Sequence, residues 1–307
     1  MARVKKNLKT TWKLLKETFA AFNEDKVPKL SAALSYYTIF SIAPMLVLII
    51  GLGSIFFGRE AIQGEVFGLI VEYVGVEAAA QIQNVLKETS IRHDTVLSTI
   101  ISGATLLLTA TGIFSEIQDS INQIWGLKTK PQKGLIKLVL NRVLSFSMIL
   151  VLGFVLVVSL VASYLLELSL RKLKALFDDE LVDSLVVMDY VLIFAAITVL
   201  FMFIFKVLPD AKIGWRYVMR GAVVTSLFFL LGRYLIGFYL KQSATISAYG
   251  AAGSLILLLA WVYYSSIILY FGAEFTQVYA RHKGMRIEPN KYAVVVEVEV
   301  KETRGVM

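Results

Sequence analysis

The stretch that decides the fold is LSAALSYYTIFSIAPMLVLIIGLGSIFF, residues 30–57, which contains no acidic, basic or histidine side chain. A helix needs roughly 20 mostly apolar residues to cross the hydrocarbon core of a bilayer. This run exceeds that length and is far too long for a strand. Its apolar residues are contiguous and do not alternate, which excludes a membrane-spanning barrel strand. The run therefore predicts a transmembrane helix.

Five further segments have a similar character: residues 97–113, 143–166, 185–208, 221–240 and 251–273. The first of them is short, but its helix can continue through Ile117 and Ile121. The chain as a whole is 57% hydrophobic and 18% charged, whereas soluble proteins average about 45–50% apolar and about 25% charged. This composition argues against a soluble, nucleic-acid-binding or disordered protein. We predict an all-α integral membrane protein with six transmembrane helices.

The distribution of basic residues predicts the orientation. If the N-terminus is cytoplasmic, most of the 31 Lys and Arg residues fall in connections on the cytoplasmic side, as the positive-inside rule requires. The first apolar run is longer than the hydrophobic part of a signal peptide, so we expect it to remain as a membrane helix. The prediction is a multi-pass protein of the plasma (inner) membrane with both termini in the cytoplasm.

Three regions follow from this pattern. Residues 1–29 place Val4, Leu8, Leu15, Phe19 and Phe22 at helical spacing among lysines, which predicts an interfacial helix that meets anionic lipid of the cytoplasmic leaflet. A solvated basic tail is the alternative. Residues 30–280 form the six-helix membrane domain, whose outer connections, 58–96 and 167–184, have amphipathic helical patterns. Residues 281–307 form a cytoplasmic tail, where valines alternate from 294 to 300, predicting a short strand or a poorly ordered segment.

Several short motifs resemble a known family. They are Ser31-Ala-Ala-Leu-Ser-Tyr-Tyr37, Ser41-Ile-Ala-Pro44, Asn122-Gln-Ile-Trp125, Leu208-Pro209, Tyr249-Gly250, Trp261 and Gly272-Ala-Glu274. Their order and spacing resemble the YihY/BrkB virulence factor family of bacterial inner-membrane proteins, over residues from about 10 to 282. The resemblance implies a six-helix membrane protein that handles lipid or envelope components; members have also carried the label ribonuclease BN. The tail after Met285 is expected to lie outside the common pattern.

Catalytic patterns are weak. The chain has no Cys and only two histidines, His93 and His282, which the predicted topology places on opposite sides of the membrane. The best magnesium site combines Glu116, Asp119 and Glu274, although simple ion pairs with Lys128, Lys206 or Arg220 are the favoured explanation of these carboxylates. We therefore predict no enzyme, no cofactor and no nucleic-acid partner. A membrane-bound metal-dependent ribonuclease and a non-catalytic membrane scaffold stay as alternatives, and a homo-oligomer is left open.

Arg233 is the most informative polar residue, because it lies inside a predicted crossing, about 18 Å from the inner edge. An arginine at that depth is expected to face protein or water and not lipid. Pro44 frees the carbonyl of Phe40 at a similar depth. We predict a midplane polar cavity for lipid or an amphipathic anion, which favours a transporter, a flippase-like protein or an envelope-maintenance factor. The predicted lining residues are Arg233, Phe40, Ser41, Pro44, Tyr36, Tyr37 and Thr105. A purely structural arginine is the alternative.

Overall fold

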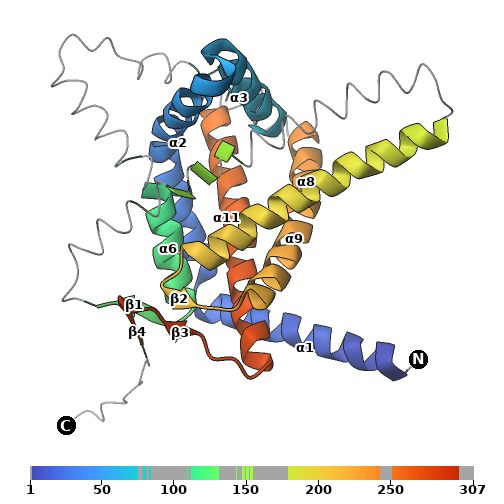
Figure 1. Ribbon diagram of the computed structural model, residues 1–307, viewed down its shortest axis with the longest axis vertical. Helices are drawn as coiled ribbons and strands as arrows, with labels where there is room; N and C mark the ends of the chain where they lie inside the picture. The colour runs from blue at the N-terminus through green and yellow to red at the C-terminus, as the bar shows by residue number, and fades with distance from the viewer. Residues whose placement is uncertain are drawn as a thin grey trace.

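The computed structural model describes residues 2–74, 112–130, 179–242 and 251–296, with isolated positions between them. In Figure 1 three helices stand side by side along the long axis of the molecule. They are α2 (Val27–Phe57), α6 (Gly112–Ile124) and α11 (Ala251–His282). On the other side of α11 packs α9 (Trp215–Gln242), and α8 (Asp179–Val207) packs against α9.

These helices fall where the hydropathy pattern placed them. Four of the predicted crossings coincide with parts of α2, α8, α9 and α11, although α8 ends one residue before the predicted end at 208. The predicted crossing 97–113 continues into α6. Within the described ranges, two helices contain a window long and apolar enough to cross a membrane, at Tyr190–Val207 and Leu258–His282. Most of the segments 97–113 and 143–166 lies outside the described residues. A helix at the start of the first outer connection is confirmed by α3 (Arg59–Val74).

In the helix α2, polar side chains face the interior of the protein and aromatic side chains face outward. This is the reverse of a helix in a soluble protein. Its buried side carries the hydroxyl residues Ser31, Ser35, Thr38 and Ser41, whereas Tyr36, Tyr37 and Phe40 are exposed. The hydroxyls of Ser35 and Thr38 donate to the carbonyls of Ser31 and Leu34, at 2.8 and 2.7 Å. A helix that packs in water shows the reverse arrangement. In lipid, the exposed aromatic side requires no cover.

Close packing of α9 on α11 depends on two glycines. A Cβ added to Gly221 would lie 1.8 Å from Thr276 Oγ1, and one added to Gly272 would lie 1.8 Å from Thr225 Oγ1. Each threonine hydroxyl donates to the carbonyl four residues earlier, at 2.7 Å. This reciprocal arrangement lets the two backbones approach, as small residues do between membrane helices.

Two small antiparallel sheets correct the all-α prediction. The strand β1 (Leu127–Thr129) pairs with β4 (Ala293–Val295), and β2 (Ala211–Lys212) pairs with β3 (Glu288–Pro289). The chain after α11 therefore turns back and joins the ends of α6 and α8. The alternating valines from 294 to 300 predicted a short strand or a poorly ordered segment, and β4 confirms a strand at the start of this stretch. The partner of β4 is distant in sequence, and no local pattern identifies it.

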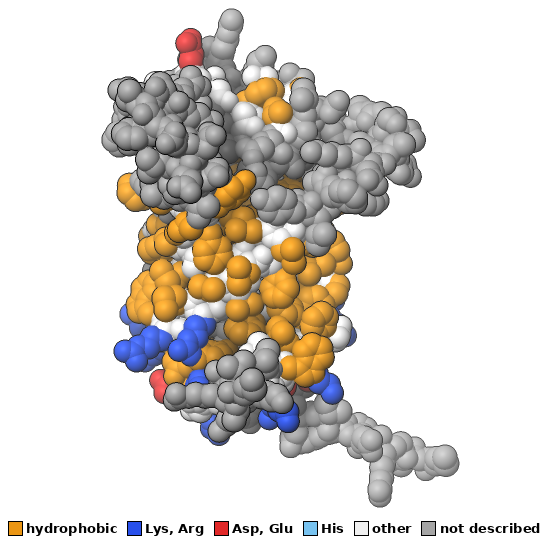
Figure 2. All heavy atoms as spheres, turned by 90° about the vertical axis from the view of Figure 1, so that its right-hand side faces the viewer, with side chains coloured by type: hydrophobic (Ala, Val, Ile, Leu, Met, Phe, Trp, Pro, Cys, Tyr) orange, Lys and Arg blue, Asp and Glu red, His pale blue; other side chains and the backbone are white. Residues whose placement is uncertain are grey.

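The lower end of the molecule, here called the base, comprises α1 (Ala2–Glu24), the four strands and the adjoining ends of α9 and α11. In Figure 1, α1 lies across the ends of the upright helices. Its Leu14 is buried against α11, while Trp12 and Phe19 are exposed. Figure 2 shows a band of hydrophobic side chains on one face with Lys and Arg side chains gathered below it. This geometry suits a helix that lies in a membrane interface.

Candidate functional site

A buried polar junction joins α6, the α8–α9 connection and the C-terminal strands. The Asn122 side chain donates to Asp210 Oδ2 at 3.0 Å and accepts from the Asp210 backbone N–H at 2.8 Å. The Asn290 side chain donates to the other carboxylate oxygen of Asp210 at 3.1 Å. Asp210 and Asn122 are almost fully buried. Both oxygens of the carboxylate are thus occupied, which is what burial of such a group requires.

Trp125, three residues after Asn122, continues this well-bonded region. Its indole N–H donates to the carbonyl of Ala273 on α11 at 3.1 Å, and the side chain is buried. Trp215, at the start of α9, differs from it in exposure. Only Trp215 is half-exposed. Trp125 is therefore a core residue that ties α6 to α11.

A second group of buried polar residues has no such partners. We call Ser31, Gln118, Tyr270 and Glu274 the unpartnered set, because side-chain oxygen or nitrogen atoms of each are buried without a hydrogen bond within the described structure. They belong to α2, α6 and α11, which pack on one another around an otherwise apolar core. Native proteins contain few such groups, and each one requires a reason.

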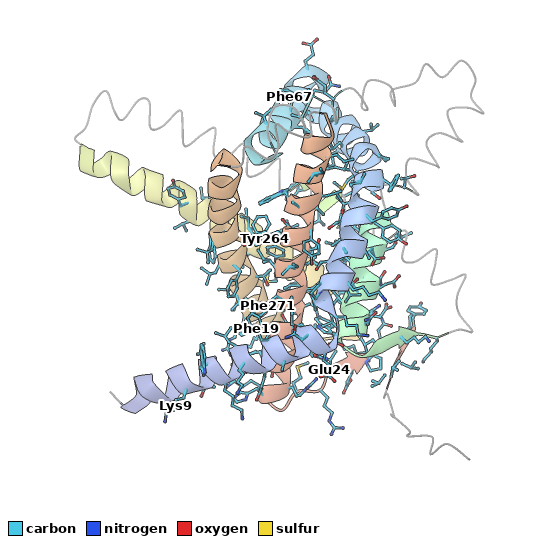
Figure 3. All side chains as sticks on the ribbon, turned by 180° about the vertical axis from the view of Figure 1, so that it is seen from behind. Lys9, Phe19, Glu24, Phe67, Tyr264 and Phe271 are labelled. Carbon is cyan, nitrogen blue, oxygen red and sulfur yellow. The ribbon has the colours of Figure 1, made fainter. Side chains whose placement is uncertain are left out.

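Glu274 faces other charged groups at the base. It is fully buried, and its charged neighbours are Asp25, Arg281 and Glu24; Figure 3 shows Glu24 at the base. Asp25 lies in the turn between α1 and α2. Burial raises the pKa of the Asp25 carboxyl above its usual value, and the negative charge of Glu24 acts in the same direction. Two carboxyl groups at one buried site repel each other when both are charged.

The three carboxylates of the predicted magnesium site are not brought together. Glu116 and Asp119 are neighbours on α6 at the level of Tyr270. Glu274 lies one turn beyond Tyr270 along α11, at the level of Asp25. In the ranges that the structure describes, no group of three Asp, Glu or His residues is arranged to hold a metal ion.

The predicted cavity lining is divided by the structure. Tyr36, Tyr37 and Phe40 are 61%, 45% and 58% exposed and contact one another on the outer side of α2. They do not line the interior, because they occupy the helix face opposite the buried hydroxyls. The helix also continues unbroken through Pro44. Ser41 is buried as predicted, with Gly112 of α6 close to its hydroxyl.

Arg233 lies in α9, but its side chain and the whole of Thr105 lie outside the described residues. Ala222 and Ser226, on the face of α9 that carries Arg233, are fully buried, and the Ser226 hydroxyl accepts a hydrogen bond from the Thr198 hydroxyl of α8 at 3.1 Å. A Cβ at the preceding Gly232 would meet the Tyr264 hydroxyl at 1.7 Å. Figure 3 shows Tyr264 well above the base. A tyrosine hydroxyl of α11 therefore lies against the α9 backbone beside Arg233.

The sequence reasoning missed Gln118, Tyr270, Asp210 and Asn290. Gln118 and Asn122 are separated by one helical turn, a spacing that already indicates a shared polar face on α6. Asp210 follows the Leu208-Pro209 motif directly. A polar residue next to a short motif can be identified from the sequence as a candidate site residue. Nothing local indicates which of these side chains finds a partner.

The chain matches the family model described as virulence factor BrkB over residues 18–295. The match extends through β3 and β4, so the expectation that the tail after Met285 lies outside the family pattern is wrong for residues 286–295. These residues belong to the same folded unit because they supply Asn290 and the two strands.

Several bacterial relatives carry the name UPF0761 membrane protein. That of Teredinibacter turnerae is 26% identical over 270 residues, covering 87% of this chain and 60% of the relative. That of Alcanivorax borkumensis is 28% identical, with 89% and 62% covered, and that of Vibrio vulnificus is 27% identical, with 84% and 79% covered. This chain thus spans about three-fifths of the length of the first two. No solved structure matches.

Proposed function

The chain belongs to the virulence factor BrkB family of membrane proteins, and on this premise we propose that it moves a lipid or an amphipathic anion across the inner membrane. In this proposal both termini lie in the cytoplasm, the base faces the cytoplasmic leaflet, and six helices cross the bilayer. The excess of basic side chains at the base supports this orientation.

The observation that carries the proposal is the unpartnered set. Leaving a buried polar group without a hydrogen bond costs about 1–3 kcal/mol, and apolar residues of similar volume would avoid that cost. Polar side chains inside a membrane domain generally mark the path of a substrate or ion. Gln118, Tyr270 and Glu274 offer hydrogen-bond donors and acceptors to a polar group that enters between the helices.

The two sides of α2 suit an amphipathic substrate. The buried hydroxyl side leads from Ser31 to Ser41 through the bundle, and the aromatic side formed by Tyr36, Tyr37 and Phe40 faces outward. A polar head travels along the first side while an acyl chain stays in lipid against the second. Arg233, in α9, supplies the cationic contact for an anionic head near the midplane.

The test is movement of a fluorescent phospholipid between the leaflets of reconstituted vesicles, followed by chemical quenching from outside. The wild-type protein is expected to equilibrate the leaflets faster than protein-free vesicles. Gln118→Leu is expected to lower the rate at least roughly tenfold, since one polar contact in the transition state is worth about 1–3 kcal/mol. Tyr190→Phe, an exposed position on α8, is the matched control and keeps the wild-type rate.

Two results would contradict the proposal. One is a wild-type rate equal to that of empty vesicles for both anionic and zwitterionic lipids. The other is a Gln118→Leu rate equal to that of Tyr190→Phe.

A further inference from the structure

A small basic cavity opens at the base, away from the unpartnered set. Arg216, Tyr217 and Arg220 of α9 line it together with Tyr279 of α11 and Lys283 just beyond it. Its volume is about 270 Å³. Pockets that enclose a whole drug-sized ligand measure roughly 300–1,000 Å³. The cavity therefore suits a compact polar group and not an acyl chain.

The charge of the lining is of one sign. Three of the five described lining residues are cationic and none is acidic. Arg216 also lies in the first turn of α9, at the positive end of the helix dipole. Such a lining is matched by an anion with several acceptor oxygens, and a phosphate group has this chemistry.

Tyr279 gives the cavity a specific polar group. The side chain is only 8% exposed, and its hydroxyl has no hydrogen-bond partner within the described structure. The guanidinium of Arg220 lies 4.9 Å from the centre of the Tyr279 ring, which holds both groups in place. The ring is further fixed by stacking on Phe275 and by packing with Leu14 of α1. The Tyr279 hydroxyl and the Arg220 guanidinium are therefore preorganised to bind an anion.

A neighbouring cavity lined by Lys206, Lys212 and Arg286 lacks these properties. The Lys206 ammonium already donates to the Ile213 carbonyl and lies over the Trp215 ring, and Glu288 brings a negative charge to the lining. The comparison favours the smaller cavity.

We propose that Arg216, Arg220, Tyr279 and Lys283 form a binding site for a phosphate group at the base of the molecule. The site deepens the proposed function by giving an anionic lipid a docking position at one leaflet. Its existence does not require that the lipid is subsequently moved. Two sources share the chemistry: the headgroup of an anionic phospholipid and a soluble phosphate.

Binding is tested on the full chain in detergent with short-chain phosphatidylglycerol as the probe, followed by native mass spectrometry. The variant Arg216→Gln/Arg220→Gln/Lys283→Gln is expected to bind the lipid at least roughly tenfold more weakly than wild type. Lys29→Gln/Lys128→Gln/Arg286→Gln removes the same charge from exposed positions at the same end and is expected to bind as wild type.

Tyr279→Phe is the second variant, because it keeps the ring and its packing and removes only the unpartnered hydroxyl. It is expected to weaken lipid binding several-fold with an unchanged thermal midpoint. If the triple variant does not fold, the binding measured with Tyr279→Phe tests the proposed phosphate site. Inorganic phosphate added at millimolar concentration separates the sources. Competition with the lipid identifies a site for soluble phosphate as well, and its absence identifies a headgroup site.

Equal losses in the pocket and control triple variants would overturn the proposal, as would unchanged binding by both the pocket triple and Tyr279→Phe. Leaflet movement is measured separately on the same proteins. Intact pocket binding without any lipid movement contradicts only the transport proposal. Normal lipid movement without pocket-dependent lipid binding contradicts only the proposed phosphate site.

Discussion

Two buried side-chain amides, those of Gln118 and Asn122, lie one helical turn apart on α6, and they differ in whether they have hydrogen-bond partners. The side-chain amide of Asn122 exchanges hydrogen bonds with Asp210, and the Asn290 side chain donates to the second carboxylate oxygen of Asp210. At Gln118 the side-chain amide has no partner within the described structure. Both residues are nearly inaccessible. Burial alone therefore does not separate a structural polar residue from a functional one, and we propose that the presence or absence of hydrogen-bond partners does.

The difference also assigns each region a role. The Asn122 junction fastens the C-terminal strands to the helix bundle, and removing a partner leaves buried groups unsatisfied. The unpartnered set weakens the folded state as it stands, so substitution by apolar residues removes a cost. Proteins keep such costs mainly at functional sites. The variants below test this assignment.

Asp210→Ala is expected to give the largest change. It leaves the amides of Asn122 and Asn290 without acceptors in a buried position, which lowers the free energy of unfolding by about 3 kcal/mol. Thermal unfolding of the purified protein in detergent measures the change. A midpoint within error of wild type would show that the junction has no structural role.

Trp125→Phe is expected to give an intermediate change. The substitution removes the indole N–H and leaves the Ala273 carbonyl unpaired, at a cost of about 1–2 kcal/mol from the hydrogen bond and the lost ring volume. The same unfolding measurement detects it. A midpoint as low as that of Asp210→Ala would mean that ring packing outweighs the hydrogen bond.

Tyr270→Phe is the counterpart of Trp125→Phe in the unpartnered set. It removes a buried hydroxyl that makes no hydrogen bond in the described structure, with Ser120 of α6 as its polar neighbour, so the free energy of unfolding is expected to stay within about 0.5 kcal/mol of wild type or to rise. Lipid movement in vesicles is expected to fall. A large loss of stability would place Tyr270 with the structural group.

Asp25→Asn is expected to give the smallest change, and one that depends on pH. Burial raises the pKa of Asp25 in the folded protein, so folding favours its protonated form. The associated stability is present below the ordinary pKa and is lost as the pH rises through the raised one. Wild type should therefore gain thermal stability as the pH falls from neutral, and Asp25→Asn should gain less. Parallel pH profiles would contradict this account.

The positions of the long helices could be predicted from the sequence, because apolar runs of membrane length are a property of each segment alone. The same holds for the amphipathic α1 and for the strand at Ala293–Val295. The pairing of that strand with β1 could not be predicted, since it depends on how the ends of α6 and α11 meet in space.

The candidate site was predictable only in part. Ser41 was predicted to line a cavity and Glu274 to belong to an alternative magnesium site, and both side chains are buried. Tyr36 and Phe40 were assigned to the interior, although their spacing from Ser31 and Thr38 puts them on the opposite helix face. Whether Gln118 or Asn122 finds a partner depends on Asp210, which is distant in sequence. Tertiary contacts decide whether a buried side-chain amide is hydrogen-bonded.

The most direct test compares Gln118→Leu with Asn122→Leu by thermal unfolding under identical conditions. Both variants replace a buried side-chain amide of α6 with the same apolar residue, one turn apart. The account predicts that Asn122→Leu lowers the midpoint substantially while Gln118→Leu leaves it unchanged or raises it. An equal fall in both would show that Gln118 is structural and would contradict the assignment of the unpartnered set to function.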